Sequence, residues 1–216
     1  SDAFHAIAAS GCDGVIALML SGGLSGTYNM VRLLAEERRD LTIRVYDSVS
    51  GSLGTGMMIL QLAEELRQGM DWQTLTERRV PWLIQNTFPF FSVDTLEYLQ
   101  KGGRIGKVTA MAGTMLQIKP LITFAADGQL QSIAKVRGRN LVIRKLIELV
   151  TQSHNGAARY NLAVANGGAP AEMEVLQGKL TTALPNYDHI WSGELDGTLS
   201  VYIGDGVLGA AVQRLE

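Results

Sequence analysis

The residues best suited to bind a ligand lie in the loop Ser21-Gly22-Gly23-Leu24-Ser25-Gly26-Thr27. An apolar run over 15–20 precedes it, as in a strand buried on both faces, and apolar residues at helical spacing follow it through Arg38. Such a loop leaves backbone N–H groups at the start of the helix, where the dipole favours an anion. The hydroxyls of Ser21, Ser25 and Thr27 can donate to the same anion.

The spacing of this loop limits which anion it could bind. No lysine follows the glycines, and the pattern is not that of a nucleotide P-loop, so a triphosphate is not expected. A carboxylate or a single phosphate fits better. The alternative is a strand-to-helix turn whose serines and threonine only cap the helix.

Composition excludes several classes of protein. The chain has 216 residues, of which 46% are hydrophobic and 19% charged, as in a soluble globular protein of one large or two small domains. No apolar run reaches the ~20 residues of a membrane span, and no secretory signal is recognisable. A single cysteine, Cys12, excludes an internal disulfide framework, and His5, His154 and His189 form no ligand pair. We therefore expect a cytoplasmic protein without a metal or other cofactor.

Charge is distributed unevenly along the chain. Residues 101–145 contain nine lysines and arginines and a single acid, Asp127, so this segment carries +8 and the remainder −10. The asymmetry suggests an acidic partner or phosphate groups facing the segment, and the alternative is a set of scattered solvated side chains. Aromatic residues are not interleaved with these cations, so nucleic acid is not the expected partner.

Helices and strands alternate in the first part of the chain. Helices are predicted over 2–10, from the loop to residue 38, over about 53–68 and from residue 71, with strands over 15–20 and 42–46. This order is typical of a doubly wound parallel sheet. Two strands are too few for such a sheet, so we expect that the front of this domain is missing. The pattern breaks at 86–89, where we predict the domain boundary.

The second part mixes hairpins with helices. The clearest hairpin signal is Asp127-Gly128, between β-like runs over 120–125 and 130–136. Helices are predicted over 95–100, 109–116, 140–152 and 170–182, with strands over 90–93, 160–165 and 189–191. The helix over 140–152 is amphipathic, and its residues predicted to face inwards are Leu141, Ile143, Leu146, Ile147 and Val150. Two apolar segments, 200–203 and 208–212, end the chain. This mixture indicates an α+β layer.

Several short motifs occur in a fixed order. The most specific is Leu96-Glu97-Tyr98-Leu99, followed by Gly102-Gly103-Arg104-Ile105 and then Ile118-Lys119-Pro120. The others are Leu24-Ser25-Gly26-Thr27-Tyr28, Asp47-Ser48, Leu53-Gly54-Thr55-Gly56, Asp127-Gly128 and Lys135-Val136-Arg137-Gly138. With these motifs the chain resembles the DegV family of bacterial fatty-acid-binding proteins, from its first residues to its C-terminus, and the match thins after Gly138.

The resemblance implies an α/β, DegV-like fold of two domains. Residues 1–86 would form the incomplete doubly wound parallel α/β domain, and residues 87–216 a lipid-binding α+β domain with a mixed or antiparallel sheet. It also implies that the protein binds one long-chain fatty acid and presents its carboxylate to a separate ATP-dependent fatty acid kinase. The acyl phosphate would then feed phospholipid synthesis. On this view the chain is a carrier, not an enzyme, without stable membrane insertion.

Site residues follow from the loop and from the resemblance. Arg104 and Arg137 are expected to face the kinase, although Arg104 could instead satisfy helix carbonyls beside Gly102. Met57 and Met58 are further candidates for an adaptable tunnel wall, with ordinary core packing as the alternative for every methionine. The residues expected to contact the lipid are Ser21, Gly22, Ser25, Gly26, Thr27, Met111, Met115 and Tyr202.

The sequence departs from the family pattern at the expected head-group site. Gly22 stands where a second serine is usual, and Tyr202-Ile203-Gly204-Asp205-Gly206 stands for a His-Thr-Gly-Pro-Gly block. Asp205 would repel a carboxylate beside it. A Thr-Ser-x-Pro segment is also missing. Two other functions therefore stay open: a phosphotransferase resembling dihydroxyacetone kinase, which would need a histidine at the site, and a divergent relative that binds another amphiphile.

Overall fold

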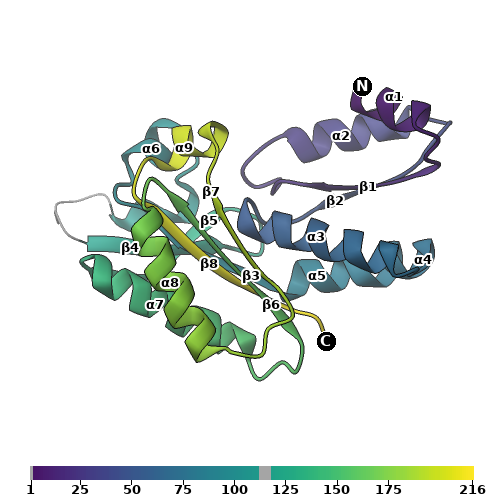
Figure 1. Ribbon diagram of the computed structural model, residues 1–216. Coiled ribbons are helices and arrows are strands. Elements are labelled where there is room, and N and C mark those ends of the chain that lie inside the picture. Colours follow the sequence, from purple (N-terminus) through teal and green to yellow (C-terminus); the bar gives the residue numbers. More distant parts are fainter. Residues whose placement is uncertain (1, 112–117) are drawn as a thin grey trace.

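The computed structural model describes residues 2–111 and 118–216, and Figure 1 shows a small pair of strands beside a larger sheet. The small sheet is parallel, in register from Gly14 opposite Thr42 to Met19 opposite Asp47. The alternation of helix and strand predicted for this part is confirmed. Its elements are α1 (Asp2–Ala9), β1 (Gly14–Met19), α2 (Thr27–Glu36), β2 (Thr42–Asp47) and α3 (Leu53–Arg67). Figure 1 shows α2 and α3 on opposite sides of the two strands.

The chain next forms one continuous helical stretch whose middle is a π-helix. Asp71 caps its start by accepting a hydrogen bond from the N–H of Thr74 at 2.9 Å, as its residue type predicts. In the π-helix the N–H of Val80 donates to the carbonyl of Leu75, five residues back. The elements are α4 (Trp72–Thr74), the π-helix η1 (Leu75–Arg79) and α5 (Val80–Asn86). Because β3 (Thr87–Ser92) begins directly after α5, the predicted break is a helix-to-strand transition without a loop.

The larger sheet has the order β5 (Leu130–Arg137), β4 (Ile118–Phe124), β3, β8 (Val207–Arg214), β6 (Tyr160–Gly167) and β7 (Ile190–Glu194). It is antiparallel except for the parallel pair β6-β7. The predicted Asp127-Gly128 hairpin joins β4 to β5, and Gly128 has the positive φ of 76° that this turn requires. The helices in this part of the chain are α6 (Glu97–Lys101), the 3₁₀ helix η2 (Gly106–Met111), α7 (Arg139–His154), α8 (Pro170–Ala183) and α9 (Gly197–Ile203).

Three predictions in this part need correction or lie outside the description. The apolar segment 200–203 is the end of helix α9, because Asp196 accepts a hydrogen bond from the N–H of Leu199 at 3.0 Å and so starts a helix there. The helix predicted over 109–116 is a 3₁₀ helix as far as Met111, and residues 112–117 lie outside the described residues. Leu141, predicted to face inwards on α7, is 37% exposed, and Val142 is buried instead.

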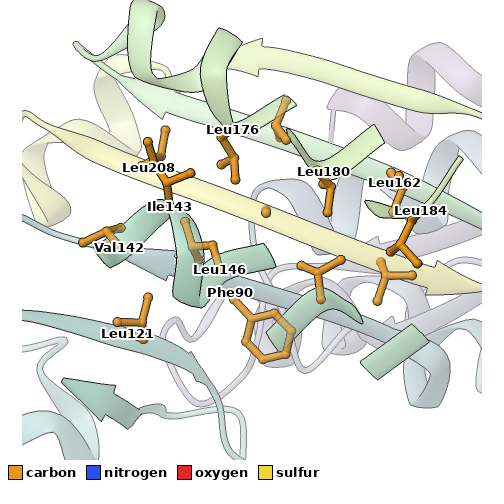
Figure 2. Close-up of a cluster of buried hydrophobic side chains, with 14 of the residues drawn as sticks. Phe90, Leu121, Val142, Ile143, Leu146, Leu162, Leu176, Leu180, Leu184 and Leu208 are labelled. Carbon is orange, nitrogen blue, oxygen red and sulfur yellow. The ribbon is translucent and has the colours of Figure 1, made fainter. Parts of the chain in front are cut away.

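Helices α7 and α8 cover one face of the larger sheet and form the main core there, shown in Figure 2. Leu146 of α7 and Leu176 and Leu180 of α8 are fully buried against the central strands. Burying such a side chain contributes roughly 1.5–3 kcal/mol. The opposite face carries small residues, and Ala163 and Ala211 leave room there for Met57 of α3. Both strands of the small sheet precede residue 87 and all strands of the larger one follow residue 86, so we propose the two domains as 1–86 and 87–216.

Candidate functional site

A cavity of about 320 Å³ lies between the small sheet and the face of the larger sheet opposite α7 and α8. Its walls are mainly apolar, which suits a hydrophobic ligand. It is lined by residues from the larger sheet, the two loops after β1 and β2, the starts of helices α2 and α3, and helices α6 and α9 with the loops beside them: Leu20, Leu24, Ser25, Thr27, Gly51, Ser52, Leu53, Pro89, Phe90, Phe91, Leu99, Arg104, Phe124, Leu130, Ala165, Leu195, Thr198, Leu199, Tyr202, Ile203, Val207 and Gly209.

One polar end of the cavity is built by the carboxyl ends of the two parallel strands. The loop after β1 contributes Ser25 and Thr27, whose hydroxyl oxygens lie 2.8 Å apart, and the loop after β2 contributes Ser52. Helices α2 and α3 begin at these loops, so the positive ends of two helix dipoles meet the cavity. The carboxyl ends of parallel strands are where α/β sheets usually bind ligands. This end can therefore hold an anionic head group.

The other predicted residues of the first loop build the loop and do not line the cavity. The buried hydroxyl of Ser21 donates to the carbonyl of Gly128 at 2.7 Å, so its proton is not available to a ligand. The N–H of Gly22 donates to the carboxylate of Asp47 at 3.0 Å. Gly26 is the N-cap residue of α2. We therefore propose that these three residues, predicted as lipid contacts, support the loop instead.

The loop after β2 is held in a strained conformation. Val49 and Ser52 have positive φ values of 50° and 48°, which cost on the order of 1–3 kcal/mol each. Asp47 holds the loop by accepting from the N–H of Val49 at 2.8 Å, and the hydroxyl oxygens of Ser48 and Thr55 lie 2.9 Å apart. Ser52 was not among the predicted site residues. Its position just after the carboxyl end of a parallel strand was the available signal.

Helices α6 and α9 form a further wall of the cavity, and their tyrosines and glycines fit together. A Cβ on Gly102 would lie 2.5 Å from the ring of Tyr202, and a Cβ on Gly204 would lie 2.5 Å from the ring of Tyr98. Each helix is therefore followed by a glycine that admits the tyrosine of the other. Tyr202, expected from the resemblance to contact the lipid, lines the cavity, and Thr198 of α9, which the sequence did not indicate, lines it too.

Arg104 lies in this wall, where the sequence had suggested a partner-facing residue. Its Nε donates to the carbonyl of Leu24 at 3.2 Å, its Nη1 donates to the carbonyl of Gly102 at 2.7 Å, and its guanidinium lies 4.9 Å from the ring centre of Tyr202. The bond to Gly102 agrees with the alternative reading of a cation that satisfies helix carbonyls. Among the described residues that line the cavity, Arg104 is the only charged one.

The remaining candidates lie elsewhere. Met57 and Met58 pack in two separate hydrophobic clusters, as their alternative reading predicted, and neither lines the cavity. Met115 and the side chain of Met111 lie outside the described part of the chain. Arg137 is exposed on β5, where a partner could reach it. Asp205 is not a lining residue and sits against the backbone of Gly168, so the expected repulsion of a carboxylate is not supported.

Most of the positive charge in 101–145 is paired with acids. Arg139 binds Glu172, whose pKa it lowers, and the hydrogen bond from Lys107 lowers the pKa of Asp127. Lys101, Lys119 and Lys145 also form ion pairs, with Glu97, Asp94 and Glu148. Five of the nine cations are thus paired, so the charge asymmetry along the sequence is partly offset in space, and it is weaker support for an acidic partner than the sequence suggested.

Gly23 fixes the loop against the hairpin, and its substitution provides a test. A Cβ at Gly23 would lie 2.4 Å from the carbonyl carbon of Gly128, so the backbone would have to move. We expect Gly23→Ala to lower the free energy of unfolding by about 1–3 kcal/mol, measured by urea denaturation. Gly26→Ala is the matched control, because Gly26 has a φ of −69° and no atom within 4 Å of its added Cβ. Equal losses in the two variants would contradict this role of Gly23.

Two further observations bear on the kind of protein. Within residues 2–111 and 118–216, no helix combines the length and the apolar character that crossing a membrane would need. In the same part of the chain, no group of three or more histidine, cysteine and acidic side chains could hold a metal ion.

Comparison with known proteins identifies relatives of the whole chain. A family model described as "Uncharacterised protein, DegV family" matches residues 1–215. A DegV domain-containing protein of Clostridium acetobutylicum is 33% identical over 209 residues, which are 97% of this chain and 74% of the relative. Another from Streptomyces coelicolor is 31% identical over 215 residues, which are 98% of this chain and 74% of the relative.

Solved structures share the fold. A DegV family protein from Thermus thermophilus, described by its fatty acid binding, is 28% identical, with a TM-score of 0.90 over 99% of this chain and 75% of that one. A fatty acid binding DegV family protein from Streptococcus agalactiae is 25% identical, with a TM-score of 0.87 over 100% of this chain and 75% of that one. The fold expected from the sequence motifs is confirmed. With its family-model match over residues 1–215, this chain belongs to the DegV family.

Proposed function

We propose that the protein binds one long-chain fatty acid in the cavity between its two sheets. The observation that carries this proposal is the composition of the cavity: a mainly apolar lining that includes hydroxyls, two helix starts and one arginine. An acyl chain gains ~0.8 kcal/mol for each buried CH₂, so a palmitoyl chain could gain on the order of 10 kcal/mol. The polar groups then need only keep the carboxylate hydrogen-bonded. The fatty acid binding described for two similar structures supports the same ligand class.

We assign the head group to Ser25, Thr27 and Ser52, with Arg104 and Tyr202 completing that end of the cavity. All five residues line the cavity. The bond from Arg104 to the carbonyl of Leu24 keeps its guanidinium beside the loop that carries Ser25. A charge-assisted hydrogen bond to a carboxylate is roughly twice as strong as a neutral one. The cavity therefore favours an anionic amphiphile over a neutral one.

The direct test is the lipid that the purified protein carries. We expect organic extraction followed by mass spectrometry to recover long-chain fatty acid, and calorimetry to detect binding of palmitate or oleate to the delipidated protein. Intact-mass spectrometry under native conditions should show the protein with one lipid bound. If no fatty acid is recovered and neither acid binds, the proposed function is wrong.

The same proposal includes a role for the bound acid. The protein would present the carboxylate to a separate ATP-dependent fatty acid kinase in the cytoplasm, and the acyl phosphate would serve phospholipid synthesis. Arg137, exposed on β5, is our candidate for contact with that kinase. We expect acyl phosphate only when kinase, ATP and loaded protein are all present. ATP-dependent product from this chain alone would favour an enzyme instead.

The geometry gives the phosphotransferase alternative no support. None of the three histidines is among the described residues that line the cavity. His154 packs against the ring of Tyr160, and His189 lies 2.9 Å from the carboxylate of Glu64. A covalent carbonyl adduct on histidine would therefore have to form outside the cavity. We retain the carrier as the proposed function.

A further inference from the structure

Gly209 is a glycine that the fold itself does not require. It lies in the middle of β8, between β3 and β6, with no positive φ. An added Cβ would meet its nearest atoms, from Leu53, Phe90 and Phe91, at 3.4–3.6 Å, which is ordinary van der Waals contact. A glycine inside a strand lowers stability relative to alanine, and it often marks a place where a ligand approaches the backbone.

Gly209 belongs to a row of residues across the sheet that faces the cavity. It pairs with Phe91 on β3 and with Ala165 on β6, and all three line the cavity. Ala210 and Val164, the chain neighbours of this row, belong instead to the core beneath α7 and α8. Residues paired across neighbouring strands point to the same face of the sheet. The row therefore presents a phenyl ring from Phe91, no side chain from Gly209 and a methyl group from Ala165 to the cavity. At Gly209 and Ala165 the cavity therefore comes closest to the backbone of the sheet.

We propose that Gly209 and Ala165 set the length of acyl chain that the cavity accepts, with the chain lying directly on the backbone of β8. This inference rests on the proposed function and goes beyond it by naming what selects among fatty acids. Met57 of α3 packs over Ala163 and Ala211 in the next row, and Leu53 of α3 packs against both rows, since its Cδ1 would lie 3.4 Å from a Cβ on Gly209. Gly209 and Ala165 still line the cavity beside Leu53, so an acyl chain there would occupy the space that larger side chains would fill.

The sharpest variant is Gly209→Ala, because we expect its effects on stability and on binding to have opposite signs. A strand alanine in an unstrained position should raise the melting temperature of the delipidated protein by about 1–4 °C. The added methyl group should displace about one methylene of palmitate and weaken its binding about fourfold. A variant that merely folded poorly would lose stability as well as affinity.

Ala165→Leu tests chain length. It adds three carbons to the face of the sheet that lines the cavity, so palmitate binding should weaken about 50-fold while binding of the shorter laurate changes by less than about fourfold. Gly193→Ala is the matched control: it lies opposite Ala165 on β7, is exposed and does not line the cavity. Its palmitate affinity should equal that of the unsubstituted protein.

The outcomes separate the inference from the proposed function. Calorimetry with palmitate and laurate is run on the three delipidated variants and the unsubstituted protein. If the unsubstituted protein binds palmitate but Gly209→Ala and Ala165→Leu bind both acids as it does, the inference is overturned and the carrier function stands. Equal losses of palmitate and laurate in Ala165→Leu also overturn it. If the unsubstituted protein binds neither acid, the proposed function fails, and the inference fails with it.

Discussion

Replacing Arg79 with leucine is expected to lower the free energy of unfolding by about 3–5 kcal/mol. Arg79 Nε donates to both carboxylate oxygens of Glu65, at 2.7 and 2.9 Å, and its Nη1 donates to the carbonyl of Leu215 at 2.8 Å. The Glu65 side chain is only 7% exposed. Without its arginine this carboxylate would remain buried with a single amide donor, from Gln61. The measurement is urea denaturation followed by circular dichroism.

Two controls assign the loss to the buried charge. Arg32→Leu breaks an ion pair with Glu36 whose side chains are 46% and 60% exposed, and it should cost less than about 1 kcal/mol. The double variant Glu65→Leu/Arg79→Leu should recover part of the stability, because it leaves no unpaired charge. A loss in Arg79→Leu no larger than that in Arg32→Leu would mean that the Glu65 carboxylate remains solvated when its partner is removed.

The stability expected from this pair has a structural reason. Glu65 lies on α3, Arg79 on the π-helix and Leu215 just after β8, so the three groups join the helices that follow the small sheet to the last strand of the larger one. A buried amide network continues from here, since Gln61 accepts from Asn161, which also donates to Gln213. Polar groups in such a network are costly to leave unsatisfied.

Sequence patterns predicted those parts of the fold that local chemistry determines. Gly128 can adopt the positive φ of a tight turn, so Asp127-Gly128 indicated the β4-β5 hairpin before any partner strand was known. Asp71 and the apolar run before the first loop are similar local signals, although β1 is half-buried apart from Leu18 and not buried on both faces as predicted. The first turn of α7 could not be predicted in this way, although the predicted burial of Ile143, Leu146 and Val150 is confirmed. Leu141 and Val142 are both apolar, and only packing against the sheet decides which is buried.

The residues of the candidate site also differ in whether local sequence could predict them. Ser25 and Thr27 were predicted because a loop before a helix presents its N–H groups and hydroxyls where the helix dipole favours an anion. Ser21 was assigned to the ligand by the same argument, yet its hydroxyl donates to Gly128, 107 residues away in the sequence. Thr198 enters the cavity from a helix that no local motif connects to the loop. Contacts at such separations depend on the tertiary fold.

Arg104→Gln is expected to weaken palmitate binding about 10- to 100-fold while leaving the binding of hexadecanol nearly unchanged. Arg104 is the only charged side chain among the described residues that line the cavity, and it lies beside the loop of Ser25 and Thr27. A hydrogen bond to a charged partner contributes about 1.5–3 kcal/mol, which corresponds to this change in affinity. Hexadecanol has the same tail but no charge. Calorimetry with both ligands gives the selectivity directly.

Hexadecanol also distinguishes two roles of Arg104: pairing with the carboxylate of the ligand and support of the cavity wall. Arg104 donates to the carbonyls of Leu24 and Gly102, so its loss could loosen that wall, and a looser wall would weaken palmitate and hexadecanol together. Lys101→Gln is the matched control, because Lys101 is 72% exposed and pairs with Glu97 outside the cavity. It should change neither affinity. A parallel loss of both ligands in Arg104→Gln would assign Arg104 to the wall, and the carboxylate would then depend on the hydroxyls and helix starts alone.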